Sequence, residues 1–336
     1  MPSSAPASRQ NAPDAAATTA GEFALIQRHF SRPCGHTALA GGDDAALLHP
    51  RPGMELAVSA DMLVAGTHFF PDADPHDLGW KTLAVNVSDL AAMGADPRWA
   101  LLSLALPAAD DAWIAAFADG FYACAERFGV DLAGGDTTRG PLTLSVTILG
   151  EVPRGQALTR AGANAGDDIW VSGQPGLAAL GLEMLRGTFA PTADGERCLA
   201  ALHRPQPRVA LGQALRGLAS AALDISDGLL GDLGHILVQS RCGATLHEDA
   251  LPLAALYATG ASPALARRCL LAGGDDYELL FCAPPAARAA ITALGPALAL
   301  PLTRIGTLSD APGTVALRSA DGTLTALAAR GYDHFG

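Results

Sequence analysis

Apolar and polar positions along the chain follow two different periods, which predicts a mixture of helices and strands. In the first half, apolar residues recur at helical spacing in three segments, at residues 21–30, 77–97 and 111–129. Gly94 and Pro97 are placed to end the second of these helices, because glycine is favoured just beyond a helix and proline cannot continue one. Shorter apolar runs predict three strands, at residues 55–61, 98–107 and 141–152.

A polar segment punctuated by glycine and proline separates this half from the next. It covers residues 151–167 and contains Pro153, Gly155, Gly162 and Gly166. The apolar pattern then restarts, with strands predicted at residues 168–173, 277–285 and 303–309 and a strand leading into a helix within 221–240. Further helices are predicted from about residue 177, within 208–219 and between the last two strands. We therefore expect an N-terminal domain at 21–152 and a C-terminal domain at 153–336.

The first 20 residues have a different composition from the rest. They are rich in Ala, Pro, Ser and Thr and contain no apolar core of the kind a signal peptide needs. We predict a disordered tail at residues 1–20. No uninterrupted apolar run along the chain reaches the length of ~18 residues that a membrane helix requires, and we expect a cytoplasmic protein.

Composition and charge narrow the classes of function. Hydrophobic residues make up 49% of the 336 positions, which is enough for the cores of two domains. The formal net charge is −12 and the sequence pI is about 5.1, so we expect neither a nucleic-acid nor a membrane partner. The six cysteines have no C-x-x-C spacing and the nine histidines form no H-E-x-x-H, which argues against zinc and dithiol chemistry. The only lysine, Lys81, follows Trp80 where a Walker A loop needs glycine, and a P-loop is excluded.

A glycine pair precedes a carboxylate three times, in "AGGDD" at residues 40–44 and 272–276 and in "AGGDT" at 133–137. Any one copy is explained as an ordinary turn, because Gly and Asp are both turn residues. Other acids are predicted at the ends of elements or in an apolar helix, and the set comprises Asp43, Asp44, Asp61, Asp89, Asp136, Asp224 and Asp227. Convergent carboxylates with glycine-rich loops favour a Mg²⁺-nucleotide site, since Mg²⁺ is held by carboxylates together with substrate phosphates.

Asp89 is the acid that folding alone explains least, because "LAVNVSDLAAMG" is apolar nearly throughout. A carboxylate in a buried helix must be paired, hydrogen-bonded or bound to metal. Its structural alternative is a buried hydrogen bond to Ser88 or Asn86.

Three other side chains are candidates for contacts with a substrate, and each has a structural alternative. His68 lies beside Phe69 and Phe70 and could simply pack there. Arg160 could pair with phosphate or be an ordinary exposed arginine, and Tyr332 could stack on a ligand or fill space near the C-terminus. Cys34 in "PCGHT" has no supporting partner nearby in the sequence, and we discount it as a reactive thiol.

Taken in order, several motifs resemble those of the thiamine-monophosphate kinase family. They are "GDDAALL", "SADMLVAGTHF", "KTLAVNVSDLAAMGADP", "GGDTTRGPL", "LTRAGANAGD", "DISDGLLGDLGHI", "GGDDYELLF" and "GYDHF", and they run from about Gly21 to Phe335. That family is related to aminoimidazole ribonucleotide synthetase, selenophosphate synthetase and a hydrogenase maturation factor. The resemblance implies a two-domain α/β (α+β) fold of the aminoimidazole ribonucleotide synthetase type. In this fold the N-terminal domain has a mixed sheet covered by helices and forms the contact of a homodimer. The C-terminal domain is an α/β sandwich, and ATP lies in a cleft between the two domains.

The resemblance also implies roles for individual residues. Ligands of several Mg²⁺ ions would be Asp44, Ser59, Asp61, Asp89, Asp136, Asp224 and Asp227, of which Asp89, Asp136 and Asp227 would act in catalysis. Contacts to ATP would come from Gly135, Asp136, Arg160 and Ser226. Contacts to thiamine monophosphate would come from His68, Asp275 and Tyr332. The chain departs from the family pattern at Ala60, usually Thr, and at Asp275, usually Glu.

The implied reaction transfers the γ-phosphoryl group of ATP to the phosphate of thiamine monophosphate, which gives thiamine diphosphate. A phosphate oxygen is already deprotonated at neutral pH, so this acceptor needs no general base. Two alternatives remain open, a synthetase of the same superfamily acting on an amide or selenide, and a non-catalytic Mg²⁺-nucleotide regulator. A selenophosphate synthetase would carry a lysine near its N-terminal cysteine, and none lies near Cys34.

Overall fold

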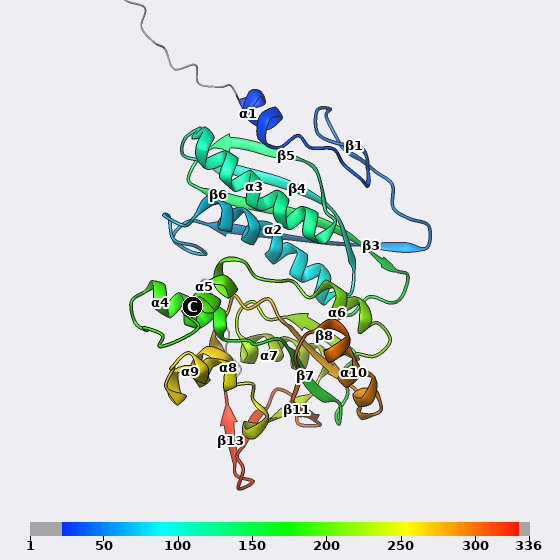
Figure 1. The fold of residues 1–336 in the computed structure, drawn as a ribbon. Helices are drawn as coiled ribbons and strands as arrows, with labels where there is room; N and C mark the ends of the chain where they lie inside the picture. The colour runs from blue at the N-terminus through cyan, green and yellow to red at the C-terminus, as the bar shows by residue number, and fades with distance from the viewer. Residues whose placement is uncertain (1–21, 329–336) are drawn as a thin grey trace, which may run out of the picture.

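The computed structural model describes residues 22–328, which form two units that each consist of a sheet and its covering helices (Figure 1). The helices of the N-terminal unit are α1 (Glu22–His29), α2 (Pro75–Ala92) and α3 (Asp111–Phe128). Its strands are β1 (Thr37–Leu39), β2 (Leu47–Leu48), β3 (Met54–Val64), β4 (Asp96–Leu106), β5 (Asp131–Arg139) and β6 (Thr143–Pro153). The tail predicted at 1–20 lies outside the described residues.

The four long strands of this unit form a sheet in the order β3-β6-β4-β5, with β4 and β5 parallel and the other pairs antiparallel. The helices α2 and α3 pack together against one face of it (Figure 1). Exposure alternates along β3, so Leu56, Val58 and Met62 face solvent while Ser59 and Asp61 are partly buried on the helix side. This alternation directs two of the predicted ligands toward α2.

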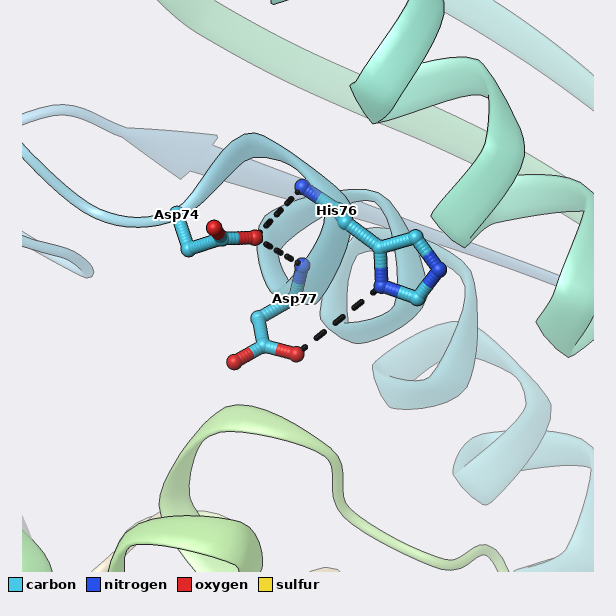
Figure 2. A group of neighbouring side chains, drawn as sticks. All are labelled: Asp74, His76 and Asp77. Atoms are coloured by element: carbon cyan, nitrogen blue, oxygen red, sulfur yellow. Dashed lines mark hydrogen bonds and ion pairs between the residues drawn. The ribbon is translucent and has the colours of Figure 1, made fainter.

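Helix α2 is buried on nearly all sides and carries Asp89 into the molecule. Its start is fixed by Asp74, whose Oδ1 accepts hydrogen bonds from the backbone nitrogens of His76 at 2.9 Å and Asp77 at 3.1 Å (Figure 2). Close contact with α3 depends on Gly79, where a Cβ atom would lie 2.0 Å from the carbonyl oxygen of Phe117. Gly94, at φ 65°, follows the C-cap as the sequence predicts.

The C-terminal unit has a seven-stranded sheet in the order β13-β12-β9-β11-β7-β10-β8. Its strands are β7 (Asp168–Ser172), β8 (Ala221–Asp224), β9 (Gly243–His247), β10 (Leu279–Ala283), β11 (Leu302–Ser309), β12 (Val315–Arg318) and β13 (Leu324–Leu327). Its helices are α4 (Leu177–Leu185), α5 (Gly195–His203), α6 (Val209–Ala214), α7 (Leu229–Ser240), α8 (Ala254–Ala258), α9 (Pro263–Ala272) and α10 (Arg288–Leu298), with short 3₁₀ turns at Glu248–Ala250 and Pro285–Ala287.

The central strands of this sheet are buried on both faces, which explains their continuous apolar runs. On β7, Ile169 and Val171 join a core with α7, while Trp170 packs on the opposite side and stacks on Phe281 with ring centroids 6.3 Å apart. The sheet is therefore the middle layer of a sandwich. No helix in the described part of the chain is long and apolar enough to cross a membrane.

Three sequence predictions about these elements are wrong. The glycine-rich segment at 133–137, predicted as a loop, lies within β5, where Gly135 has φ 155° and a Cβ would lie 1.8 Å from the carbonyl oxygen of Leu102. Asp61 lies inside β3 and does not end it, because β3 continues to Val64. The helix predicted within 208–219 ends after Ala214, and the chain then turns at Gly217, which has φ 74°.

Polar contacts join the two units at α2 and at the end of α6. The indole nitrogen of Trp80 donates to the carbonyl oxygen of Pro205 at 2.9 Å. Arg216 binds Asp96 of β4 at 3.0 Å, and its Nε donates to the carbonyl oxygen of Gly94 at 2.6 Å. These contacts place α2 at the boundary between the two units.

Candidate active site

A cleft with a volume of about 930 Å³ opens between the two units. Its N-terminal wall is made by α2, the end of β3 and the loop that follows, and its C-terminal wall by α4, α5 and two loops. Acidic side chains gather at one part of the cleft, whereas Phe69, Phe70, Leu182 and Leu202 provide apolar surface elsewhere in it. A cleft with a few convergent polar groups on an apolar lining is typical of a small-molecule site.

Four of the predicted ligands line this cleft together, and they are Asp61, Asp89, Asp224 and Asp227. We refer to them as the acidic cluster. Asp61 comes from β3, Asp89 from α2, Asp224 from the end of β8 and Asp227 from the loop before α7. Both units therefore contribute to the cluster, as the resemblance implies.

Hydroxyl and amide groups orient the members of the acidic cluster. Ser59 donates its hydroxyl to Asp89 Oδ2 at 2.5 Å, and Ser88 donates to Asp224 Oδ2 at 2.6 Å. Asn86 accepts the backbone N–H of Asp61 at 3.1 Å. The alternative partners expected for Asp89 are therefore used elsewhere, since Ser88 binds Asp224 and Asn86 binds the backbone of Asp61.

Burial makes the charged forms of Asp61, Asp89 and Asp224 unfavourable, and repulsion by neighbouring carboxylates adds to this effect at Asp61 and Asp224. Burial, followed by the charges of Asp89 and Asp227, raises the pKa of Asp61 to about 7. Burial also raises the pKa of Asp224, with Asp89 as the next cause. Burial raises the pKa of Asp89 as well, although the hydroxyl of Ser59 and the charge of Arg160 oppose that shift.

The residues present fit a divalent cation. The acidic cluster and Ser59 offer hard oxygen ligands of the kind that Mg²⁺ prefers. Burial raises the pKa values of Asp61, Asp89 and Asp224, which indicates that a nearby cation would stabilise their ionised forms. Among the described residues, the ligand atoms that lie close enough together to hold a metal as they stand are those of Asp74, His76 and Asp77 (Figure 2). There, however, Asp74 caps α2 and Asp77 pairs with Arg204 at 3.3 Å, so folding explains it.

Asp232 is a residue that the sequence analysis missed. It is buried in the first turn of α7, and its Oδ2 accepts the backbone N–H groups of Ser226 and Asp227, both at 3.1 Å. Burial raises its pKa to about 7, which those hydrogen bonds oppose. These two N–H groups therefore fix the loop that carries Asp227. The sequence does contain a signal for this role, because Asp232 is an acid in the first helical turn after the "SDG" loop at residues 226–228.

The second "GGDD" is a strained loop in which the two carboxylates have different tasks. Asp276 is half-buried and accepts the N–H groups of Gly176 at 2.7 Å and Ala178 at 3.4 Å, at the start of α4. Asp275, at φ 67°, lines the cleft and binds Lys81 Nζ at 3.1 Å. Only Asp275 is therefore placed to contact a ligand in the cleft.

The remaining predicted site residues are not members of the acidic cluster. Asp44 is exposed in the loop before β2. Asp136 is exposed on β5, opposite Ser103 of β4.

His68 lines the cleft and accepts the N–H of Val64 through Nδ1 at 3.0 Å, which assigns its ring proton to Nε2 in the neutral form. Arg160 is exposed in the linker, and its carbonyl oxygen accepts a hydrogen bond from Ser240 at 3.1 Å. Tyr332 lies outside the described residues.

Comparison with known proteins finds matches to both units of the chain. Residues 42–152 match the N-terminal domain of AIR synthase related proteins, and residues 164–318 match the C-terminal domain. The thiamine-monophosphate kinase of Escherichia coli K12 is 46% identical over 321 residues, which cover 94% of this chain and 98% of that protein. The enzyme of the same name from Bacillus subtilis is 34% identical, with 94% of this chain and 99% of that protein covered.

Solved structures agree with these matches. Thiamine-monophosphate kinase from Stenotrophomonas maltophilia K279a superposes with a TM-score of 0.81 at 49% identity, covering 91% of this chain and 98% of that one. AaThiL complexed with AMPPCP and TMP superposes with a TM-score of 0.72 at 29% identity, covering 94% and 97% of the two chains. The chain belongs to the thiamine-monophosphate kinase family of AIR synthase related proteins.

Proposed function

We propose that the cleft between the two units is where this chain phosphorylates thiamine monophosphate with ATP to give thiamine diphosphate. The observation that carries the proposal is the acidic cluster, which both units build at one part of a cleft with apolar surface nearby. The relative AaThiL was solved with AMPPCP and TMP together, which supports a cleft that accepts a nucleotide and a phosphate ester. A cytoplasmic location, where ATP is available, is part of the same proposal.

The reaction needs positioning and charge neutralisation rather than proton transfer. The acceptor is a phosphate oxygen that is already ionised at neutral pH, and the γ-phosphoryl group passes directly to it. Asp61, Asp89, Asp224 and Asp227 would hold Mg²⁺ ions, with Ser59 as a further oxygen ligand. When bound, Mg²⁺ would neutralise phosphate charge and stabilise the charge that develops in the transition state.

Other residues would hold the two substrates. Arg160, which lies close enough to Asp89 to affect its pKa, would contact the phosphates of ATP. Ser226 would contact ATP from a loop that Asp232 fixes. His68 and Asp275 line the cleft and would contact thiamine monophosphate. Gly135, Asp136 and Asp44 remain proposed contacts to ATP or metal.

The decisive test of the proposed function is product formation. Purified protein with Mg²⁺, ATP and thiamine monophosphate should form thiamine diphosphate and ADP in equal amounts. A superfamily synthetase would leave thiamine monophosphate unchanged but consume ATP with an amide or selenide. A regulator would bind Mg²⁺-ATP and consume neither substrate.

We expect transfer in a single step, without a phosphoenzyme. Among the described residues that line the cleft, neither the serine nor the cysteine, Ser226 and Cys269, donates a hydrogen bond to a carboxylate or a histidine that could activate it as a nucleophile. ATP made chiral at the γ-phosphorus should therefore give product with inverted configuration. Retention of configuration, or label trapped on the protein from ATP alone, would contradict direct transfer.

A homodimer formed through the N-terminal sheet is the second part of the proposal. The face of this sheet opposite α2 and α3 exposes Leu56, Val58 and Met62 on β3 and Leu101 on β4. We refer to these four residues as the open face. An apolar row of this kind on a sheet is characteristic of a protein interface, and the family fold supplies a second copy as its partner.

Substitution of Val58 by Asp should convert a dimer to monomers, because two-fold symmetry would bring two new carboxylates together in an apolar interface. Val58 is 61% exposed in the single chain. Val238→Asp is the matched control, since Val238 on α7 is 71% exposed and distant from the open face. Sedimentation equilibrium of both variants checks the prediction. A wild type that sediments as a monomer, or dimers in both variants, would refute it.

A further inference from the structure

The single lysine of the chain occupies a position that folding alone does not explain. Lys81 lies on α2, is 5% exposed and lines the cleft. Its Nζ binds Asp275 Oδ1 at 3.1 Å, across the boundary between the two units. Burial of an ammonium group is costly unless it is paired, and an apolar side chain of similar length would fill the same space without that cost.

The choice of lysine at this position is also informative. The sequence contains 22 lysines and arginines, and all of them except Lys81 are arginine. Arginine presents a planar fork, whereas lysine presents a compact charge with three donors on a flexible stem. A compact charge suits the contact with Asp275, because Lys81 reaches this carboxylate from a buried helix. The use of lysine at this position therefore indicates that an ammonium group is required there.

The partner of Lys81 lies on a strained loop that is tied to the acidic cluster. Asp275 and Tyr277 have φ values of 67° and 51°, which are unfavourable for residues other than glycine, above all for tyrosine. The Asp275 N–H donates to Ser226 O at 2.9 Å, and the Tyr277 N–H donates to Ile225 O at 2.8 Å. The loop that carries Asp275 is thus bonded to the loop that carries Asp227.

Two donors converge on one oxygen of Asp275. Lys81 reaches Oδ1 at 3.1 Å, and the hydroxyl of Tyr277 donates to the same oxygen at 3.3 Å. Oδ2 takes no part in either contact. The Tyr277 hydroxyl also lies within the electrostatic influence of Asp61 and Asp224, so the Asp275 carboxylate sits beside the acidic cluster. Lys81 offsets the repulsion that this placement creates.

We infer that Lys81 is a positioning residue that holds the Asp275 carboxylate in place to bind the thiamine part of the substrate. The inference rests on the proposed function. The aminopyrimidine of thiamine has an amino donor and its thiazolium ring is cationic, and both are groups that a carboxylate binds. Lys81 acts through Asp275, and its removal should weaken the binding of thiamine monophosphate while that of ATP stays the same.

The test is a double-mutant cycle with Lys81→Met, Asp275→Asn and the double variant, assayed for KM of both substrates. We expect KM for thiamine monophosphate to rise roughly 10-fold in Lys81→Met, with KM for ATP within about twofold of wild type. In the double variant, KM for thiamine monophosphate should be no higher than in the more impaired single variant. The reason is that the effects of two residues that act as a unit do not add. Lys81→Arg should recover part of the loss, since it restores charge but not shape.

A binding measurement and a control separate positioning from stability. The rise in melting temperature caused by thiamine monophosphate alone should shrink in Lys81→Met. Arg216→Met removes another ion pair between the units, at Asp96 and away from the cleft, and should leave KM for thiamine monophosphate unchanged. An unchanged KM in Lys81→Met, or additive losses in the double variant, would overturn the inference. A wild type that forms no thiamine diphosphate would instead refute the proposed function.

Discussion

Replacement of Asp89 by Asn should lower turnover at least ~100-fold and yet leave the metal-free protein as stable as wild type or slightly more stable. Asp89 is a buried acid on α2, and burial disfavours its charge. Without metal it repels Asp61 and Asp224, whose pKa values its charge helps to raise. Asn removes that charge and retains an oxygen that can accept the hydroxyl of Ser59. Activity and metal-free stability should therefore change in opposite directions.

Two thermal melts and one turnover assay check this prediction. In chelator, the melting temperature of Asp89→Asn should equal or exceed that of wild type. With Mg²⁺ and ATP, the wild type should gain more than the variant, because a ligand stabilises a protein in proportion to its binding. Asp111→Asn is the matched control, since Asp111 is an exposed carboxylate at the start of α3 and should leave turnover unchanged. A variant that melts much lower in chelator but turns over normally would make Asp89 a structural residue.

Local signals in the sequence were sufficient for the elements that carry the acidic cluster. Helix α2 was predicted because its apolar period is long and a glycine and a proline follow it, and the structure confirms it at Pro75–Ala92. Strand β8 and the helix after it were predicted from an apolar run that ends at Asp224. Both predictions depend only on the pattern of neighbouring residues, and such local patterns are the most reliable sequence signals for helices and strands.

Features that depend on distant contacts could not be predicted in the same way. Strand β5 was mistaken for a loop because two glycines interrupt it, and only the neighbouring β4 shows why a residue with no Cβ is needed beside Leu102. The pairing of Lys81 with Asp275 joins two units and depends on a positive φ at Asp275. Neither the pairing partner nor the backbone conformation leaves a local pattern.

Arg160→Met removes a positive charge, whereas Asp89→Asn removes a negative one. We expect Arg160→Met to lower both turnover and the stability of the metal-free protein. The charge of Arg160 opposes the raised pKa values of Asp89 and Asp232. The adjacent backbone is fixed, since Thr159 O accepts the N–H of Ala222 at 2.9 Å. Loss of this cation leaves the acidic cluster more repulsive, so the protein in chelator should melt below wild type, where Asp89→Asn does not.

Turnover of Arg160→Met should fall roughly 100-fold or more, because an arginine on the transferring phosphate stabilises charge in the transition state. Arg160→Lys should restore the melting temperature better than the rate, since it returns the charge but not the two-pronged contact with phosphate. Arg154→Met is the control, as Arg154 is exposed earlier in the same linker and is not one of the charges that shift the pKa of Asp89 or Asp232. If Arg160→Met melted above wild type in chelator, Arg160 would not offset the acidic cluster. If its rate were unchanged, the proposed contact with ATP would be wrong, because Met can offer phosphate neither charge nor a hydrogen bond.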